Sequence, residues 1–222
     1  MLRITRLLRD NGMYLSARRI LQFPGEALRN RLLARKLGVS RIFIGRGALI
    51  RGLSSMEIGE DFVAAPDLWL EAVSHFNEQT FTPRLVIGKH VRVSRWVHIA
   101  VTNRVEIGDH VLIGSKVLIT DHDHGSYSDP STSPDIPPAL RPLTRDRTTI
   151  VGSKVWLGDG VVVTAGSVIG EGCVIGANSV VIGTIPPFTV AVGSPARPIK
   201  QFDFDQNAWV SCGQRLAVRT IE

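Results

Sequence analysis

A short run of alternating acids and histidines contains the side chains best suited to carry chemistry in this sequence. The run is Asp121-His122-Asp123-His124. A neutral imidazole can accept a proton near pH 7, and a neighbouring carboxylate can orient its ring. The run therefore predicts a general base, either His122 or His124, with Asp121 or Asp123 as the orienting acid. The four other histidines are His75, His90, His98 and His110.

The same run could instead bind a metal ion, because two histidines and two aspartates lie within four residues. It does not fit a calcium loop, since Gly125 stands where a third oxygen ligand is expected and no glutamate closes the loop. The two cysteines, Cys173 and Cys212, provide no metal-ligand spacing and no disulfide framework. We favour the general base and expect no metal.

A long interruption follows this run. Residues 125–147 contain five prolines and no apolar periodicity. A long insertion between regular segments is more often functional than accidental. Polar residues that break a repeat at the edge of such an insertion are typical of a site added to a scaffold.

The scaffold is a six-residue repeat. From Val151 to Pro186 the chain reads VGSKVW, LGDGVV, VTAGSV, IGEGCV, IGANSV and VIGTIP. An aliphatic residue opens each unit, and the fifth position is mostly small or β-branched. This pattern predicts a hexapeptide β-solenoid, in which each unit is a short strand plus a turn and three units close one triangular coil. Cys173 occupies an inward position and is expected to be a small core residue.

The repeat extends over most of the chain. It begins near Ile44, breaks down between Asp61 and Arg84, and resumes at Ile87. We therefore expect one β-solenoid domain over residues 41–200, interrupted by the insertion described above. Residues 201–222 are expected to form a C-terminal helix or tail that covers the open end of the solenoid.

The N-terminal segment, residues 1–40, is predicted to form basic amphipathic helices. The first 51 residues contain twelve Lys and Arg against two acids, whereas the remainder contains fourteen against eighteen. Leucines recur at helical spacing, Pro24-Gly25 predicts a break, and Gly38 is a suitable C-terminal cap. Such helices can cap the first coil, contact an anionic membrane surface, or bind nucleic acid. We expect no nucleic-acid partner.

The sequence also bears on localisation. It contains no apolar run long enough to span a bilayer. Its N-terminus lacks an apolar stretch ending in a cleavage site, as a secretory signal would have. These observations predict a cytoplasmic protein, peripheral at the inner face of the membrane if residues 1–40 bind lipid.

The chain resembles the left-handed β-helix acyltransferases of the hexapeptide-repeat superfamily. The stretch that begins VWLGDGVVVTAGSVIG and ends VGSPARPIK is similar to galactoside, maltose and polysaccharide O-acetyltransferases. The resemblance covers about residues 87–200 and is most specific over 150–200. It implies an all-β solenoid whose parallel strands wind left-handed, against the usual crossover rule. It further implies a homotrimer that binds acetyl-CoA between adjacent prisms and acetylates a sugar or polysaccharide precursor by direct transfer.

The resemblance also assigns roles to residues. The family's catalytic histidine matches His122, with His124 as the alternative and Asp121 as a candidate to orient the ring. The expected acetyl-CoA contacts are Trp156, Asp159, Ala177, Ile182, Gly183, Arg197 and Lys200. The chain departs from its relatives at Ile182-Gly183, where Thr-Lys is common, and at Asp159, where some relatives have Ser. These departures predict that the cofactor is held with somewhat different contacts.

Two other functions fit parts of the sequence. A γ-type carbonic anhydrase uses the same scaffold, but it needs three histidines at one edge, so another histidine would have to join His122. A non-catalytic β-helix that only mediates assembly would need neither the acid–histidine run nor the long insertion.

Overall fold

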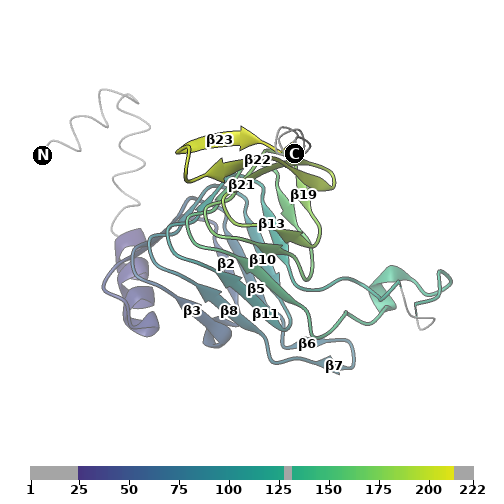
Figure 1. Ribbon diagram of the computed structural model, residues 1–222. Coiled ribbons are helices and arrows are strands. Elements are labelled where there is room, and N and C mark those ends of the chain that lie inside the picture. Colours follow the sequence, from purple (N-terminus) through teal and green to yellow (C-terminus); the bar gives the residue numbers. More distant parts are fainter. Residues whose placement is uncertain (1–24, 128–131, 213–222) are drawn as a thin grey trace, which may run out of the picture.

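The computed structural model describes residues 25–127 and 132–212. Its body is a three-sided prism of short parallel strands (Figure 1). Sheet A contains β1 (Ile42–Ile44), β4 (Phe62–Ala64), β9 (Arg92–Val93), β12 (Leu112–Ile113), β15 (Trp156–Leu157), β18 (Val174–Ile175) and β21 (Thr189–Gly193). Sheet B contains β2 (Leu49–Arg51), β5 (Trp69–Ala72), β10 (His98–Val101), β13 (Leu118–Thr120), β16 (Val162–Val163) and β19 (Val180–Val181). Sheet C contains β3 (Met56–Ile58), β8 (Arg84–Ile87), β11 (Arg104–Ile107), β14 (Thr148–Val151), β17 (Val168–Ile169) and β20 (Thr184–Ile185).

The six-residue period explains why the chain forms this prism. The aliphatic residue that opens each unit points inward, and the strand register stacks it on its counterpart in the next coil, as Ile113 stacks on Leu157 and Leu157 on Ile175. All three side chains are fully buried. Cys173 is also fully buried, as predicted for a small core residue. The predicted solenoid is therefore confirmed.

The turns between sheets stack into three corners, called here the A–B, B–C and C–A corners after the sheets that they join. Backbone hydrogen bonds connect successive turns at the A–B corner, where the Lys116 amide donates to Arg95 at 2.9 Å and the Asn178 amide to Asp159 at 2.8 Å. Glycine after the opening aliphatic residue is required by close approach of the coils. A Cβ atom on Gly158 would lie 2.7 Å from the backbone nitrogen of Ala177.

The break that the sequence shows between Asp61 and Arg84 is smaller than expected. Strands β4 and β5 continue the solenoid, and the irregular part is a hairpin of β6 (His75–Phe76) and β7 (Gln79–Thr80). The hairpin leaves the B–C corner, as does the inserted loop two coils further along, which contains the short 3-10 helix η2 (Pro138–Leu140). Both project to the same side of the prism (Figure 1).

The hairpin holds the base of the inserted loop. The backbone amide of Leu143 donates to Oε1 of Gln79 at 2.7 Å, and Nε2 of Gln79 donates to the carbonyl of Leu143 at 3.2 Å. The side chain of Leu143 is buried. The loop is therefore fixed at its base to its own chain.

A helix over residues 25–37 covers the first coil and is followed by the short 3-10 helix η1 (Leu53–Ser55) between β2 and β3. The helix ends as predicted, with Gly38 at φ 69° and the Val39 amide bonded to the carbonyl of Ala34 at 3.0 Å. The side-chain amide of Asn30 accepts from the backbone N–H of Ile44 at 3.0 Å and donates to its carbonyl at 3.3 Å. The helix thus provides hydrogen-bond partners for the backbone N–H and C=O groups of Ile44 at the edge of β1. The helix predicted within residues 1–24 lies outside the described residues.

The opposite end of the prism corrects one prediction. Residues 201–211 belong to strands and the turn between them, not to a helix or tail, because β22 (Ala196–Asp203) and β23 (Ala208–Ser211) form an antiparallel extension of β21. The helix or tail expected over residues 213–222 lies outside the described residues. Aromatic contacts stabilise this extension, with the rings of Phe202 and Trp209 5.3 Å apart. No described helix is long and apolar enough to cross a membrane.

Candidate active site

His122 lies at the B–C corner, directly after β13. Its Nδ1 atom is 2.8 Å from Oδ1 of Asp121. The Asp121 side chain is fully buried, whereas that of His122 is 12% exposed. The same carboxylate accepts from the backbone amides of Thr102, at 2.9 Å, and Asn103, at 2.7 Å, in the coil below.

These contacts keep Asp121 ionised. Burial alone would raise its pKa, but the hydrogen bonds from His122 and from the backbone of Thr102 and Asn103 outweigh this effect and lower the pKa below its ordinary value. An ionised carboxylate can only accept a hydrogen bond, so the Nδ1 atom of His122 must carry the hydrogen. The lone pair of the neutral ring is then on Nε2, the atom that can act as a base.

Two threonines hold the end of β13 in place. The Thr120 hydroxyl lies 3.2 Å from Nδ1 of His122 and also accepts from its backbone amide at 3.3 Å. The Thr149 hydroxyl donates to the Thr120 carbonyl at 2.8 Å from the far side of the inserted loop. Sequence reasoning missed these residues and the backbone amides that hold Asp121, because they belong to neighbouring coils and follow no motif.

Asp123 and His124 contact the inserted loop instead. Oδ2 of Asp123 lies 3.0 Å from Nη1 of Arg147, and its backbone pairs with Thr144. His124 forms a β-bridge with Leu143 and packs edge-on against Phe76, with ring centroids 5.2 Å apart. Among the described residues, the ring–carboxylate contact of this run therefore belongs to His122.

The remaining histidines are dispersed over the prism. His90 and His110 stack on each other at the C–A corner, 4.7 Å apart, where His90 also contacts Asp61. His98 lies on sheet B, stacked on Trp69 at 3.9 Å. Burial lowers the pKa of His98, although Glu71 acts in the opposite direction. Within residues 25–127 and 132–212, no three His, Cys, Asp or Glu side chains are grouped so as to hold a metal ion.

The residues expected to contact acetyl-CoA are divided between different parts of the prism. Asp159 and Ala177 lie in the turns of the A–B corner, and the exposed Trp156 is on the adjoining strand β15. Ile182 and Gly183 lie at the B–C corner, two coils above His122. Arg197 and Lys200 are exposed on β22.

Two of these residues also have clear local roles. Oδ1 of Asp159 accepts from the backbone amide of Ser115 at 2.6 Å, so this carboxylate ties two coils together. Gly183 has φ 78°, in the left-handed region that favours glycine, and no atom lies within 4 Å of where its Cβ would be. The departure from Thr-Lys at Ile182-Gly183 therefore leaves an open surface at this corner.

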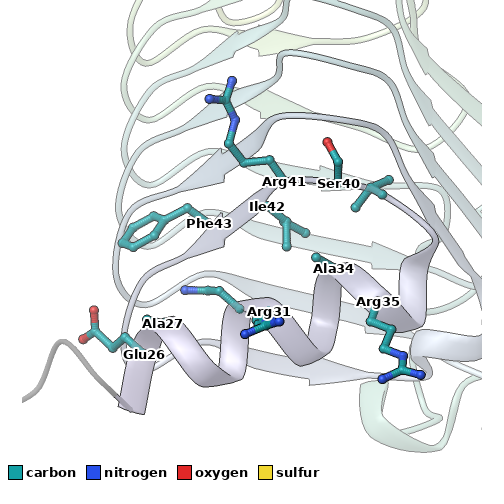
Figure 2. Close-up of a pocket in the computed structure, with 11 residues that line it drawn as sticks. Glu26, Ala27, Arg31, Ala34, Arg35, Ser40, Arg41, Ile42 and Phe43 are labelled. Carbon is teal, nitrogen blue, oxygen red and sulfur yellow. The ribbon is translucent and has the colours of Figure 1, made fainter.

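Sheet B separates the residues of the A–B corner, Asp159 and Ala177, from His122 at the B–C corner of the same chain. Lys116, at the A–B corner, and His122, at the B–C corner, lie at opposite ends of β13, and six residues can span at most about 20 Å. A pocket between the helix and β1, lined by residues including Glu26, Arg31 and Phe43, contains no predicted site residue (Figure 2).

The chain is similar in sequence to known acetyltransferases. The profile of the family described as bacterial transferase hexapeptide (six repeats) matches residues 148–183. WbbJ of Escherichia coli K12, named provisionally as a lipopolysaccharide biosynthesis O-acetyl transferase, is 43% identical over 162 residues, which are 72% of this chain and 79% of WbbJ. The galactoside O-acetyltransferase of the same organism is 30% identical over 135 residues, or 61% of each chain.

Solved structures share the fold. The hexapeptide-repeat acetyltransferase VCA0836 of Vibrio cholerae, crystallised with acetyl coenzyme A, has a TM-score of 0.52 and 23% identity, covering 90% of this chain and 85% of that one. AntD, an N-acyltransferase of Bacillus cereus crystallised with dTDP and 3-hydroxybutyryl-CoA, has a TM-score of 0.62 and 19% identity, covering 79% and 90%.

Proposed function

The chain belongs to the hexapeptide-repeat acetyltransferases, and from this premise we propose that it transfers the acetyl group of acetyl-CoA to a hydroxyl of a sugar or glycan precursor. The observation that carries the proposal is the Asp121–His122 pair, which leaves Nε2 of His122 able to accept a proton. The names of WbbJ and the galactoside enzyme support a sugar hydroxyl as the acceptor. The VCA0836 complex supports acetyl-CoA as the donor.

The mechanism follows from the geometry of the pair. Nε2 of His122 removes the proton of the acceptor hydroxyl as its oxygen attacks the thioester carbonyl. Asp121 stabilises the imidazolium that forms and stays ionised itself. The tetrahedral intermediate collapses by breaking its carbon–sulfur bond, and the departing CoA thiolate takes the proton from Nε2. A backbone N–H group can stabilise the oxyanion. The acetyl group passes directly between substrates, without an acyl-enzyme.

The separation of the two corners supports a homotrimer. Residues proposed to hold acetyl-CoA at the A–B corner lie across sheet B from His122 of the same chain. A ring of subunits joins two different patches at every contact. We therefore place the A–B corner of one subunit beside the B–C corner of its neighbour, with acetyl-CoA between them and left-handed coils as in the family.

The N-terminal helix supports a peripheral membrane contact at the cytoplasmic face. One face of the helix packs on the first coil through Asn30 and Ala34, which are buried. The other face presents Leu28, 60% exposed, and Leu32, 59% exposed, beside the exposed Arg31. Exposed leucines among basic residues are typical of helices that bind anionic lipid surfaces.

The function is tested by incubating the protein with acetyl-CoA and a panel of sugars, glycan fragments and activated sugars, and by following release of the free thiol of CoA. Acceptor-dependent release that is lost in His122→Ala and retained in His75→Ala supports the proposal. Release with an amine acceptor alone, or with no acceptor at all, contradicts it.

A further inference from the structure

A tryptophan and two cations form an exposed cluster at the A–B corner. Trp96 is 52% exposed. The guanidinium carbon of Arg95 lies 4.6 Å from the centre of its ring, and Nζ of Lys116, one coil above, lies 5.8 Å from it. Arg95 is held in place by Asp67, with a nitrogen–oxygen distance of 2.8 Å. Lys116 has no carboxylate partner among the residues that the structure describes.

The turn that contains Trp96 has the same backbone conformation as the other turns of this corner. Every turn of this corner needs a left-handed residue, and two later turns use Gly160 and Asn178 for it, with φ 70° and 57°. Trp96 adopts φ 57° at the same place. Lys116, with φ 59°, and Asp67, with φ 68°, adopt this conformation in the adjacent turns, so the cluster is distinguished by its exposure and its contacts, not by its backbone.

The cluster lies at the level of the base. Lys116 lies in the turn before β13, the strand that leads to His122, and Trp96 belongs to the coil directly below. Asp159 and Ala177 occupy the next two turns above Lys116. If the cofactor lies along those upper turns, as proposed above, the acceptor must approach the thioester from the lower coils, where Trp96 and Arg95 are exposed.

We propose that Arg95, Trp96 and Lys116 bind the phosphate-bearing part of the acceptor, a sugar that carries a diphosphate group, and present its hydroxyl to His122 of the neighbouring subunit. Lys116 and Arg95 supply positive charge for the phosphates, and the indole supplies an apolar face for the sugar or its attached group. The inference rests on the proposed function. Because Lys116 and His122 of one chain lie at opposite ends of β13, on different corners, we place the two halves of the site on different subunits.

The first test is binding, independent of catalysis. Inorganic pyrophosphate is titrated into the protein saturated with CoA, so that phosphate contacts of the cofactor are already occupied. Trp96→Asn keeps the left-handed turn, because Asn tolerates this conformation. Lys116→Ala removes the ammonium group of the cluster. Lys116→Ala is expected to weaken binding about tenfold or more, Lys116→Arg to preserve it, and Lys89→Ala, a lysine exposed in a C–A turn, to leave it unchanged. Equal binding by Lys116→Ala and the parent protein overturns the inference.

The second test is kinetic. The same acceptor sugar is supplied free, linked to a nucleoside diphosphate, or linked to a prenyl diphosphate, which distinguishes the two biological sources of the diphosphate. Trp96→Asn and Lys116→Ala should raise KM about tenfold for a diphosphate-linked sugar and leave KM for the free sugar and for acetyl-CoA unchanged. A rise in KM for acetyl-CoA instead would assign the cluster to the cofactor. If the parent protein releases thiol and both variants keep its KM for the diphosphate-linked sugar, this inference is contradicted and the proposed function still stands.

The third test is complementation between subunits. Chains carrying His122→Ala and chains carrying Trp96→Asn with Lys116→Ala are co-expressed with different tags and purified by both. If the site is shared between subunits, the mixed oligomer should regain activity toward the diphosphate-linked sugar. Some of its interfaces combine an intact His122 from one chain with an intact cluster from the other. Absence of recovery shows that both parts act within one chain and contradicts the placement.

Discussion

The ring of His122 and the carboxylate of Asp121 form a hydrogen-bonded pair, with 2.8 Å between Nδ1 and Oδ1. The carboxylate is buried and is held by backbone amides of the coil below. This arrangement fixes which ring nitrogen carries the hydrogen and points the reactive lone pair away from Asp121.

Replacing His122 with alanine should lower kcat by roughly 10²–10⁴, the usual contribution of a general base. The melting temperature should fall modestly, because the ring is only 12% exposed and its loss removes a hydrogen bond from the buried Asp121 carboxylate, so kcat is compared well below the transition. His124→Ala is the matched control and should retain most of the activity, since His124 packs on Phe76. If His124→Ala lost activity and His122→Ala remained active, His124 would be the general base instead of His122.

Asp121→Asn should reduce kcat by up to about 10⁴-fold, the loss expected when a histidine is held in the wrong tautomer. The asparagine oxygen can accept from the amides of Thr102 and Asn103, which turns its NH₂ group toward Nδ1 of His122. The ring must then carry its hydrogen on Nε2, where the base is needed. Steady-state kinetics over a range of pH, with circular dichroism to verify folding, measures the effect; a full-activity variant would exclude an orienting role.

The same carboxylate should make folding stability depend on pH. The pKa of Asp121 is lowered in the folded protein, so its contribution is fully present above the unfolded value of about 3.9. The contribution is lost as the pH falls from there through the folded pKa. Urea unfolding of the parent protein and Asp121→Asn, measured between pH 7 and 3, should show their stabilities converging below about pH 4. A difference that stays constant across this range would contradict the assignment.

The protein should sediment as a trimer. The two halves of the proposed site lie on different corners of one chain, so we expect the cleft to form only between subunits. Analytical ultracentrifugation across a concentration series, combined with the thiol-release assay, is the measurement. A stable monomer with full activity would exclude a shared site.

The outer face of the N-terminal helix should bind anionic vesicles at low salt. Each basic residue near such a surface contributes about 1 kcal/mol, and the contribution is screened by salt. Leu28→Gln with Leu32→Gln removes the exposed apolar pair but keeps helix-forming residues, so flotation should be weakened while the melting temperature holds. Neutral vesicles and high salt are the controls. No flotation with anionic vesicles at low salt would leave the helix only its role in capping β1.

The sequence alone was sufficient to predict the solenoid, because its period is local. Every sixth residue from Val151 to Val181 is an inward aliphatic, and after three units the chain returns to the same sheet, so Ile175 stacks on Leu157. The helix end at Gly38 was predictable for the same reason, since a cap depends on a few adjacent residues. The position of the inserted loop followed from where the period stops.

Only the tertiary structure decided the contacts between coils. Asp121 is held by Thr102 and Asn103, which lie nineteen and eighteen residues away along the chain and belong to no motif. The strands after residue 195 could not be distinguished from a tail, because β22 and β23 are defined by pairing with β21 and not by periodicity. The division of the predicted site between two corners was likewise invisible in the sequence. Distance along a coiled chain says nothing about which side of the prism a turn occupies until the coils are closed.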